Sequence, residues 1–353
     1  MFIVGIGTAT PPQRYRQKEC WTTLKAATRF QELTPRSQAI LKKVLTGDNG
    51  IATRHLALED LREAFEITPD VLHARFLEHA PKLAAQAATR ALAAAQIEPA
   101  EIDAILISTC TGYLCPGLTS YTCERLGLRP DALALDLVGQ GCGAALPNLQ
   151  TARSLLAAGH YRRVLSICVE VCSAAFYLDD DAGVLISACL FGDGAAAAVL
   201  SASASANGGR RVQWKSGGSL LKPEDRNRLR FQQKHGLLRN ILTPEVPALA
   251  AASVGAVLDD TLARNQVARS QINGWILHPG GRDVLVALCE GISLSDHDVR
   301  WSAGVLREHG NMSSPSVWFV LQAALAAGAP GGWWWMSAFG AGFSCHGALL
   351  AVE

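Results

Sequence analysis

The sequence lacks several features that would place it in a class at once. Its formal net charge is only +1, from 32 Lys and Arg against 31 Asp and Glu, so the charge predicts no nucleic acid or acidic membrane surface as a partner. No uninterrupted apolar run reaches the roughly 18 residues of a membrane-spanning helix. The opening MFIVGIGTATPP has neither the basic nor the long apolar region of a signal peptide. We therefore expect a cytoplasmic protein without stable membrane insertion.

Paired metal-binding cysteine motifs are also missing. The chain has ten cysteines, but no CxxC pair has a matching second pair, which argues against zinc. With 353 residues, 49% of them hydrophobic, the chain can build a large core without disulfide bonds. We expect reduced thiols and no metal site.

The sequence does contain an internal repeat. TRALAAAQIEPAEIDAILIST (89–109) aligns with TLARNQVARSQINGWILHP (261–279) at an offset of 170 between matched apolar residues. GQGCGAALPNLQTARSLLAAG, ending at Gly159, aligns with EHGNMSSPSVWFVLQAALAAG, ending at Gly328, at an offset of 169. Each copy predicts a helix, a buried strand, and a glycine-led turn that opens a second helix.

A third pair of blocks begins at Phe191 (FGDGAAAAVLS) and at Phe339 (FGAGFSCHGALLAV), at an offset of 148. The first half therefore carries about 21 additional residues (169 − 148) between its helix and its last strand. The polar segment 216–247 also falls between the copies, and we expect it to elaborate a shared site.

The repeat predicts two α/β halves in the order helix, strand, turn-helix, strand, strand. Alternating strands and helices favour mostly parallel sheets covered by helices. Two such halves packed about a pseudo-twofold axis would form a five-layered α/β/α/β/α body. The small residues and glycines of 201–212 indicate a connector, which divides the chain into residues 1–205 and 206–353.

Three polar side chains stand at the positions where ligands of α/β sheets collect, helix N-termini and strand carboxyl ends. Cys142 and Asn311 occupy equivalent turns (142 + 169 = 311), and His278 follows the second half's buried strand. Each has an alternative role. Cys142 could simply fill the core, His278 could be a satisfied core histidine, and Asn311 could be a helix cap. A helix N-terminus and a nearby imidazolium would instead depress the pKa of the Cys142 thiol and make it a nucleophile.

A thiol, an imidazole and a carboxamide suit acyl transfer from a thioester. The thiolate would take an acyl group, while the imidazole and amide N–H groups would stabilise the enolate formed when a malonyl thioester loses CO2. This chemistry needs no metal or redox cofactor.

At this point the sequence resembles a known family. The duplicated halves resemble the thiolase fold. The motifs GIGTATPP, GCGAALPNL, LFGDGAAA, HPGG, GNMSSPSV and FGAGFS resemble those of type III polyketide synthases, the chalcone synthase-like enzymes. They follow the family's order and cover almost the whole chain.

The resemblance implies a role for each matching residue. Cys142 would carry the starter and the growing polyketide, while His278 and Asn311 would decarboxylate malonyl-CoA. Phe191 matches a gatekeeper phenylalanine, and Cys115 a side chain that enters the partner's cavity in the family's homodimers. The other substrate-binding positions that the resemblance implies are Cys110, Cys172, Ala175 and Ser313.

Several positions depart from the plant enzymes. Arg239 and Asn240 stand where a second gatekeeper phenylalanine is expected, and Cys110, Cys172 and Ala175 replace threonines. These departures look more like bacterial alkylpyrone and alkylresorcinol synthases, and the small Ala175 could make room for a longer acyl chain. Because Ala52 replaces a CoA-contacting lysine, the CoA candidates are the nearby Lys42, Lys43 and Arg54. Basic residues on a helix can equally be ordinary solvated surface.

Two alternatives to an acyl-CoA-dependent polyketide synthase remain open. A ketoacyl synthase of fatty-acid synthesis shares the fold and the Cys-His-Asn set, but condenses once and takes its extender from an acyl carrier protein. An inactive homologue could serve as a scaffold or dimer partner. The starter, the number of extensions and the mode of ring closure do not follow from the sequence.

Overall fold

The repeat in the sequence reappears in the pairing of the strands. The computed structural model describes residues 1–204 and 209–353. In each half one parallel strand pair is followed by two antiparallel pairs, β4-β6-β7-β1 in the first half and β11-β12-β13-β8 in the second. The strands are β1 (Phe2–Ala9), β4 (Ala104–Thr109), β6 (Arg163–Glu170), β7 (Gly194–Ser201), β8 (Val212–Leu221), β11 (Ile272–Leu277), β12 (Gly332–Gly340) and β13 (Ser344–Val352).

The two halves join in one nine-stranded sheet, in the order β11-β12-β13-β8-β1-β7-β6-β4-β5. The junction is short, since β1 and β8 pair only through Phe2 with Gln213 and Ile3 with Val212. Strand β5 (Leu133–Val138) lies parallel to β4 at the edge of the first half.

The expectation of mostly parallel sheets is wrong, because the sheet is mixed. Strands β12 and β13 are separated only by residues 341–343 and pair antiparallel. A parallel partner would need a much longer crossover. In the first half β6 and β7 are also antiparallel, although residues 171–193, with helix α7 (Ala182–Leu190), lie between them. The additional residues predicted for the first half are therefore found at this position.

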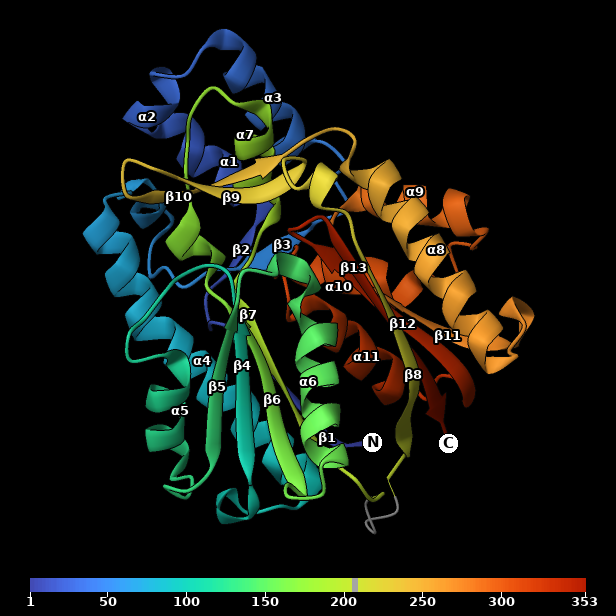
Figure 1. Ribbon diagram of the computed structural model, residues 1–353. Helices are drawn as coiled ribbons and strands as arrows, with labels where there is room; N and C mark the ends of the chain where they lie inside the picture. Colours follow the sequence, from blue (N-terminus) through green and yellow to red (C-terminus); the bar gives the residue numbers. More distant parts are fainter. Residues whose placement is uncertain (205–208) are drawn as a thin grey trace.

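The helices complete five layers, as expected (Figure 1). Helices α4 (Pro69–Ala95) and α5 (Leu118–Leu126) cover the first half-sheet, and α8 (Val246–Asn265) and α9 (Arg282–Ile292) cover the second. Helices α6 (Ala145–Ala157) and α11 (Ser316–Ala326) lie between the two half-sheets. Three apolar cores fill the spaces between these layers.

Matched residues of the repeat adopt matched conformations. Helices α4 and α8 end at Gln96 and Gln266, with left-handed φ angles of 54° and 55°. The two glutamines are separated by 170 residues (266 − 96), the offset of the repeat. Gly7 of β1 lets α4 approach closely, because a Cβ there would stand 2.3 Å from the carbonyl oxygen of Ala87.

Most of the remaining elements form a cap over one end of the sheet, where β1, β4, β6 and β8 have their carboxyl ends (Figure 1). The segment 216–247 is only partly an elaboration, because 216–221 belong to β8 in the main sheet. The rest includes a hairpin of two strands and leads into α8. The cap elements are β2 (Arg14–Arg16), α1 (Gln17–Ala26), α2 (Thr28–Gln31), α3 (Pro35–Thr46), β3 (Thr53–His55), β9 (Leu229–Lys234) and β10 (Leu237–Leu242). Helix α10 (Arg300–His309) packs against α11 and contacts β3.

The predicted boundary at 205/206 lies outside the described residues. The repeated strand pairing agrees with two halves meeting between β7 and β8, and the division into 1–205 and 206–353 stays a prediction.

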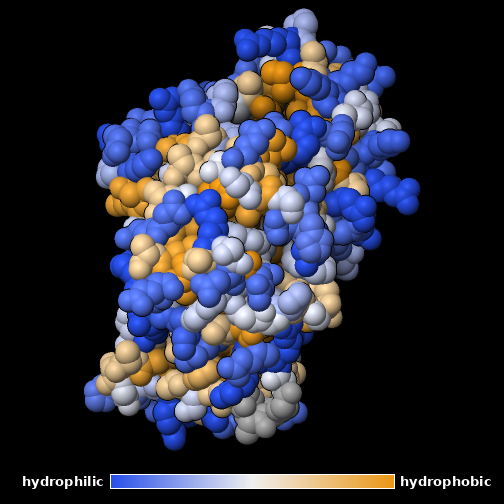
Figure 2. Space-filling view, turned by 90° about the vertical axis from the view of Figure 1, so that its right-hand side faces the viewer, coloured by the Kyte–Doolittle hydropathy of each residue, from blue (hydrophilic) through white to orange (hydrophobic). Residues whose placement is uncertain are grey.

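Helix α8 is long and apolar enough to cross a membrane by length and composition alone. Half of its apolar window is buried, however, against β8, β13 and α9. The face on the α8 and α9 side of the molecule shows hydrophobic residues in separate patches among hydrophilic ones (Figure 2). This placement is that of a helix that packs one face on the sheet and leaves the other exposed.

Candidate active site

Cys142 lies in a tight turn that precedes helix α6. The turn is a single 3-10 element, Gly141–Ala144. Gly141 has a φ of +54°, a conformation that L side chains rarely adopt. A Cβ on Gly340, at the end of β12, would stand 3.0 Å or less from the backbone atoms of Gln140, Cys142 and Gly143. The glycines therefore let the turn pack directly on the other half of the molecule.

Asn311 lies in the equivalent turn, between α10 and α11, and is buried. Its side-chain Nδ2 donates to the carbonyl oxygen of Gly280 at 3.0 Å, and its Oδ1 accepts from the backbone N–H of Ser313 at 2.8 Å. These two bonds fix the orientation of the amide. Its backbone pairs with Leu190 and Gly192, on either side of Phe191.

His278 directly follows β11 and is 1% exposed. Its ring packs edge-on against Phe339 of β12, with centroids 5.4 Å apart. Within the described part of the chain neither ring nitrogen has a hydrogen-bond partner. A buried imidazole without a partner costs free energy. The two unpartnered ring nitrogens therefore argue against the alternative that His278 is a core histidine with satisfied hydrogen bonds.

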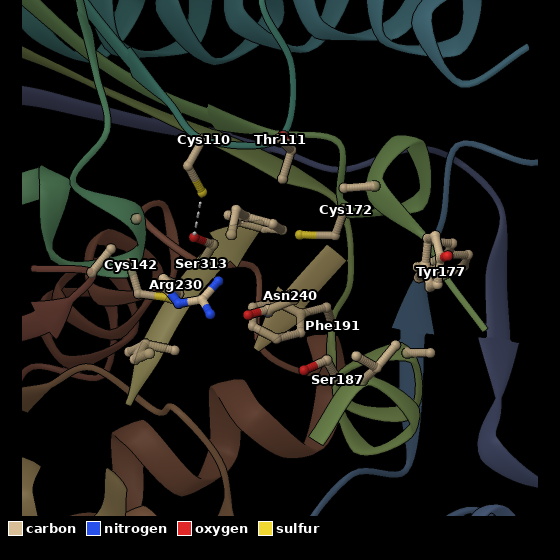
Figure 3. A pocket seen from close by; sticks show the side chains of 18 residues that line it. Cys110, Thr111, Cys142, Cys172, Tyr177, Ser187, Phe191, Arg230, Asn240 and Ser313 are labelled. Atoms are coloured by element: carbon tan, nitrogen blue, oxygen red, sulfur yellow. Dashed lines mark hydrogen bonds between the residues drawn. The ribbon is translucent and has the colours of Figure 1, made fainter. Parts of the chain in front are cut away.

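One cavity brings together six of the nine predicted catalytic and substrate-binding residues. It encloses about 620 Å³ of empty space, part of it open to solvent. Cys110, Cys142, Cys172, Phe191 and Ser313 line it (Figure 3). Ala175 also lines it. His278 and Asn311 do not line it directly. Asn311 still lowers the pKa of the Cys142 thiol, and Gly280 connects Asn311 to the strand end that carries His278.

The protonation of the resting site differs from the expectation of a depressed thiol pKa. Burial raises the pKa of Cys142 to about 12, although hydrogen bonds from Ser313 and Asn311 lower it in part. Burial also lowers the pKa of His278 to about 3. The direction of this shift is opposite to the depressed thiol pKa that the sequence predicts. A desolvated site disfavours both charged forms, and the pair rests as a thiol and a neutral imidazole.

Glu170 is a residue that the sequence analysis missed. This carboxyl group lies at the end of β6 and is fully buried. It accepts hydrogen bonds from the Cys110 backbone and from the hydroxyls of Thr111 and Ser314, at 2.7 to 2.9 Å. Burial raises its pKa. The signal was one carboxylate in the run VLSICVEV, in which Ser166 is the only other polar residue. Glu170 fixes two loops that border the cavity.

The hairpin β9-β10 closes another side of the cavity. Leu229, Phe231 and Asn240 line it, so Asn240 is the one of the two residues at the expected second gatekeeper position that lies at the cavity. Arg239 points elsewhere, because its guanidinium is ion-paired with Asp179 at 2.8 Å and Asp181 at 3.1 Å. These pairs tie the hairpin to the N-terminus of α7, which Asp181 caps.

The candidates for CoA and partner contacts lie in three different environments. Lys42 and Lys43 are exposed on α3, where a charged ligand could reach them. Arg54 is 3% exposed, and its guanidinium donates to the backbone carbonyls of Ala188 and Phe191, both at 2.8 Å. This arrangement orients the loop of Phe191 and speaks against a CoA phosphate contact. Cys115 is exposed on the loop after β4 and does not line the cavity of its own chain.

The arrangement can perform acyl transfer chemistry. A thiol, two potential hydrogen-bond donors and an apolar cavity lie together, with the imidazole free to accept or donate. Among the residues that the structure describes, no three His, Cys, Asp or Glu side chains are grouped as a metal site would require.

Comparison with known proteins agrees with this site. Residues 7–215 match the family described as FAE1/Type III polyketide synthase-like protein, and residues 221–351 match the C-terminal domain of chalcone and stilbene synthases. A 3,5-dihydroxyphenylacetyl-CoA synthase of Streptomyces toyocaensis is 30% identical, over 99% of this chain and 89% of that protein. The alpha-pyrone synthesis polyketide synthase-like Pks18 of Mycobacterium tuberculosis is also 30% identical, over 91% and 82%.

The crystal structure of PKS-I from the brown alga Ectocarpus siliculosus superposes with a TM-score of 0.91. It has 26% identity and covers 99% of this chain and 98% of that one. The chain therefore belongs to the type III polyketide synthases, acyltransferases that form carbon–carbon bonds by decarboxylative condensation.

Proposed function

We propose that Cys142 accepts an acyl group from an acyl-CoA starter and that His278 and Asn311 then drive repeated extension with malonyl-CoA. The observation that carries this proposal is the pair of unpartnered nitrogens on the buried His278. They leave a donor and an acceptor for a substrate, next to an amide that Gly280 already orients.

Loading begins with the neutral pair. The Cys142 thiol gives its proton to an imidazole nitrogen of His278 as the sulfur attacks the starter's thioester carbonyl. The carbon–sulfur bond to CoA breaks, and the CoA thiolate takes the proton back from the imidazolium. Because burial holds the pKa of Cys142 at about 12, the thiolate forms only when a substrate is in place to consume it.

Extension uses the same groups as hydrogen-bond donors. The imidazole N–H and the Asn311 amide N–H bind the thioester oxygen of malonyl-CoA. When CO2 leaves, the electron pair of the broken bond becomes an enolate on that oxygen. The enolate carbon attacks the acyl-Cys142 carbonyl and expels the Cys142 thiolate. Transfer of the lengthened chain back to Cys142 permits another round.

The product that we propose is a pyrone or a resorcinol-type phenol, formed when the extended chain cyclises. We place the enzyme in the cytoplasm, since none of its ten cysteines is in a disulfide. We expect it to act as a homodimer and to need no metal or redox cofactor. Lys42 and Lys43 remain candidates for CoA binding.

The test supplies an acyl-CoA and malonyl-CoA without any carrier protein. We expect mass spectrometry to show products that have gained more than one two-carbon unit and have cyclised. A product with only one added unit, formed only when malonyl-carrier protein is supplied, would support the ketoacyl synthase alternative. Unchanged product formation by Cys142→Ala would support the inactive-partner alternative.

A further inference from the structure

The cavity contains one charged side chain that the reaction scheme leaves unused. Arg230 lies on β9 and lines the cavity, and Figure 3 shows its guanidinium group between Cys142 and Asn240 in this view. The other lining residues are cysteines or apolar and neutral polar residues. A cation in such surroundings favours an anionic ligand.

The guanidinium group of Arg230 is oriented but not neutralised. Its Nε donates to Oδ1 of Asn227 at 3.1 Å. Within the described part of the chain its two terminal nitrogens have no acceptor and no carboxylate forms an ion pair with it. Two other arginines of this region are paired, Arg228 with Glu245 at 2.9 Å and Arg239 with Asp179. Among the described residues Arg226 also lacks a carboxylate partner but does not line the cavity, so Arg230 is the unpaired arginine of this segment that reaches the cavity.

Glu170 does not supply that partner. Its carboxyl group does not line the cavity and is already surrounded by hydrogen-bond donors from two loops. The free terminal nitrogens of Arg230 form the planar donor pair that a carboxylate binds through two parallel hydrogen bonds.

The carboxylate of malonyl-CoA is a poor fit for this position. Decarboxylation destroys the charge of that carboxylate, so a cation bound to it would stabilise the ground state more than the transition state. A carboxylate that persists through the reaction would be stabilised by the Arg230 guanidinium at every step. Such a group stands at the far end of a starter acyl chain whose thioester carbonyl is at Cys142.

We propose that Arg230 selects a starter that carries a terminal carboxylate, that is, the CoA thioester of a short dicarboxylic acid. This inference rests on the proposed function and names its substrate class. The apolar lining holds the methylene groups, Arg230 binds the carboxylate, and Cys142 receives the carbonyl carbon.

The test compares succinyl-CoA with butyryl-CoA, which has the same number of acyl carbons and no terminal charge. In the native protein we expect succinyl-CoA to be the better starter in kcat/KM. Arg230→Met should reduce kcat/KM for succinyl-CoA by about 10- to 100-fold, the range of a lost charge-assisted contact. The kcat/KM for butyryl-CoA should change by less than about threefold. Arg230→Lys keeps the charge without the planar donor pair and should recover part of the loss.

Arg226→Met is the matched control. Arg226 is an exposed arginine of the same segment that donates to the Pro223 carbonyl and does not line the cavity. Arg226→Met should leave kcat/KM unchanged for both starters. Repeating the comparison with N-acetylcysteamine thioesters removes the CoA phosphates, and the preference for the carboxylate should persist.

Three results would overturn the inference: an equal loss with both starters in Arg230→Met, no loss with either, or a preference that disappears with the N-acetylcysteamine thioesters. Binding of succinyl-CoA and butyryl-CoA to Cys142→Ala and Cys142→Ala/Arg230→Met, measured by calorimetry, gives a readout that needs no turnover. If the native protein condenses neither of these starters nor a longer acyl-CoA with malonyl-CoA, the proposed function fails. If Arg230→Met still weakens binding of succinyl-CoA alone, the carboxylate site stands.

Discussion

The side-chain amide of Asn311 donates a 3.0 Å hydrogen bond to the backbone carbonyl of Gly280. Gly280 lies two residues beyond His278, so this bond connects the turn of one donor to the strand end of the other. The two groups proposed to hold the malonyl thioester oxygen are therefore positioned as a unit, while the nucleophile comes from the other half of the chain.

Asn311→Ala should separate the two half-reactions. Loss of one enolate donor should slow malonyl-CoA decarboxylation by about 10²- to 10³-fold, while loading of Cys142 from an acyl-CoA should change far less. Rapid-quench measurement of acyl-enzyme and of released CO2 distinguishes the steps. Equal slowing of both would place Asn311 in a general structural role.

His278→Gln should change how stability depends on pH. In the unfolded chain the imidazole binds a proton near its ordinary pKa of 6.5, but burial lowers the folded pKa to about 3. As pH falls below 6.5 the unfolded state binds the additional proton, so the native fold loses stability. This loss amounts to about 2 kcal/mol at pH 5.

The glutamine variant cannot gain this proton. Urea unfolding at pH 8 and pH 5 should therefore show a smaller loss of stability for His278→Gln than for the native protein. His309 and His346 also have lowered pKa values because of burial. Both histidines are present in the native protein and in the variant, so their contributions to the pH dependence of stability cancel in the comparison. Parallel pH curves would contradict a buried neutral imidazole.

Alkylation of Cys142 reports its resting protonation state. With the pKa of Cys142 at about 12 and that of His278 at about 3, the rate of iodoacetamide labelling should rise about tenfold per pH unit from pH 7 to 9 without a plateau. Peptide mass spectrometry resolves Cys142 from the other thiols. A pH-independent rate above pH 6 would show a preformed thiolate–imidazolium pair instead.

Gly340→Ala should disable the nucleophile's turn. The new Cβ would stand 2.4 Å from the Gln140 carbonyl oxygen and 2.5 Å from the Gly143 nitrogen, both backbone atoms. Overpacking of this kind typically costs about 1–3 kcal/mol, and displacement of Cys142 should lower kcat. The matched control is Gly304→Ala in α10, where nothing lies within 4 Å. It should be neutral or stabilise the helix by about 0.5–1 kcal/mol. Equal effects of both substitutions would show that the close packing of Gly340 is not what holds the turn.

Much of the fold could be predicted because the duplication left matched residues at fixed offsets, such as Gln96 and Gln266. The mixed character of the sheet could not, since strand direction depends on loop length and the β12-β13 turn has only three residues. The burial of Arg54 could not be predicted either. A basic residue in sequence looks the same whether its guanidinium meets solvent or backbone carbonyls. The raised pKa of Cys142 required the three-dimensional burial of its turn, which no local motif encodes.

Trapping of the acyl-enzyme is the sharpest test of the role of Cys142, because Cys110, Cys142 and Cys172 all line one cavity. Incubation with an acyl-CoA alone, followed by peptide mass spectrometry, should find the acyl group on Cys142, with one CoA released for each group bound. Later addition of malonyl-CoA should remove it as an extended product. An acyl group found only on Cys110 or Cys172, or product formation by Cys142→Ala, would rule out Cys142 as the nucleophile.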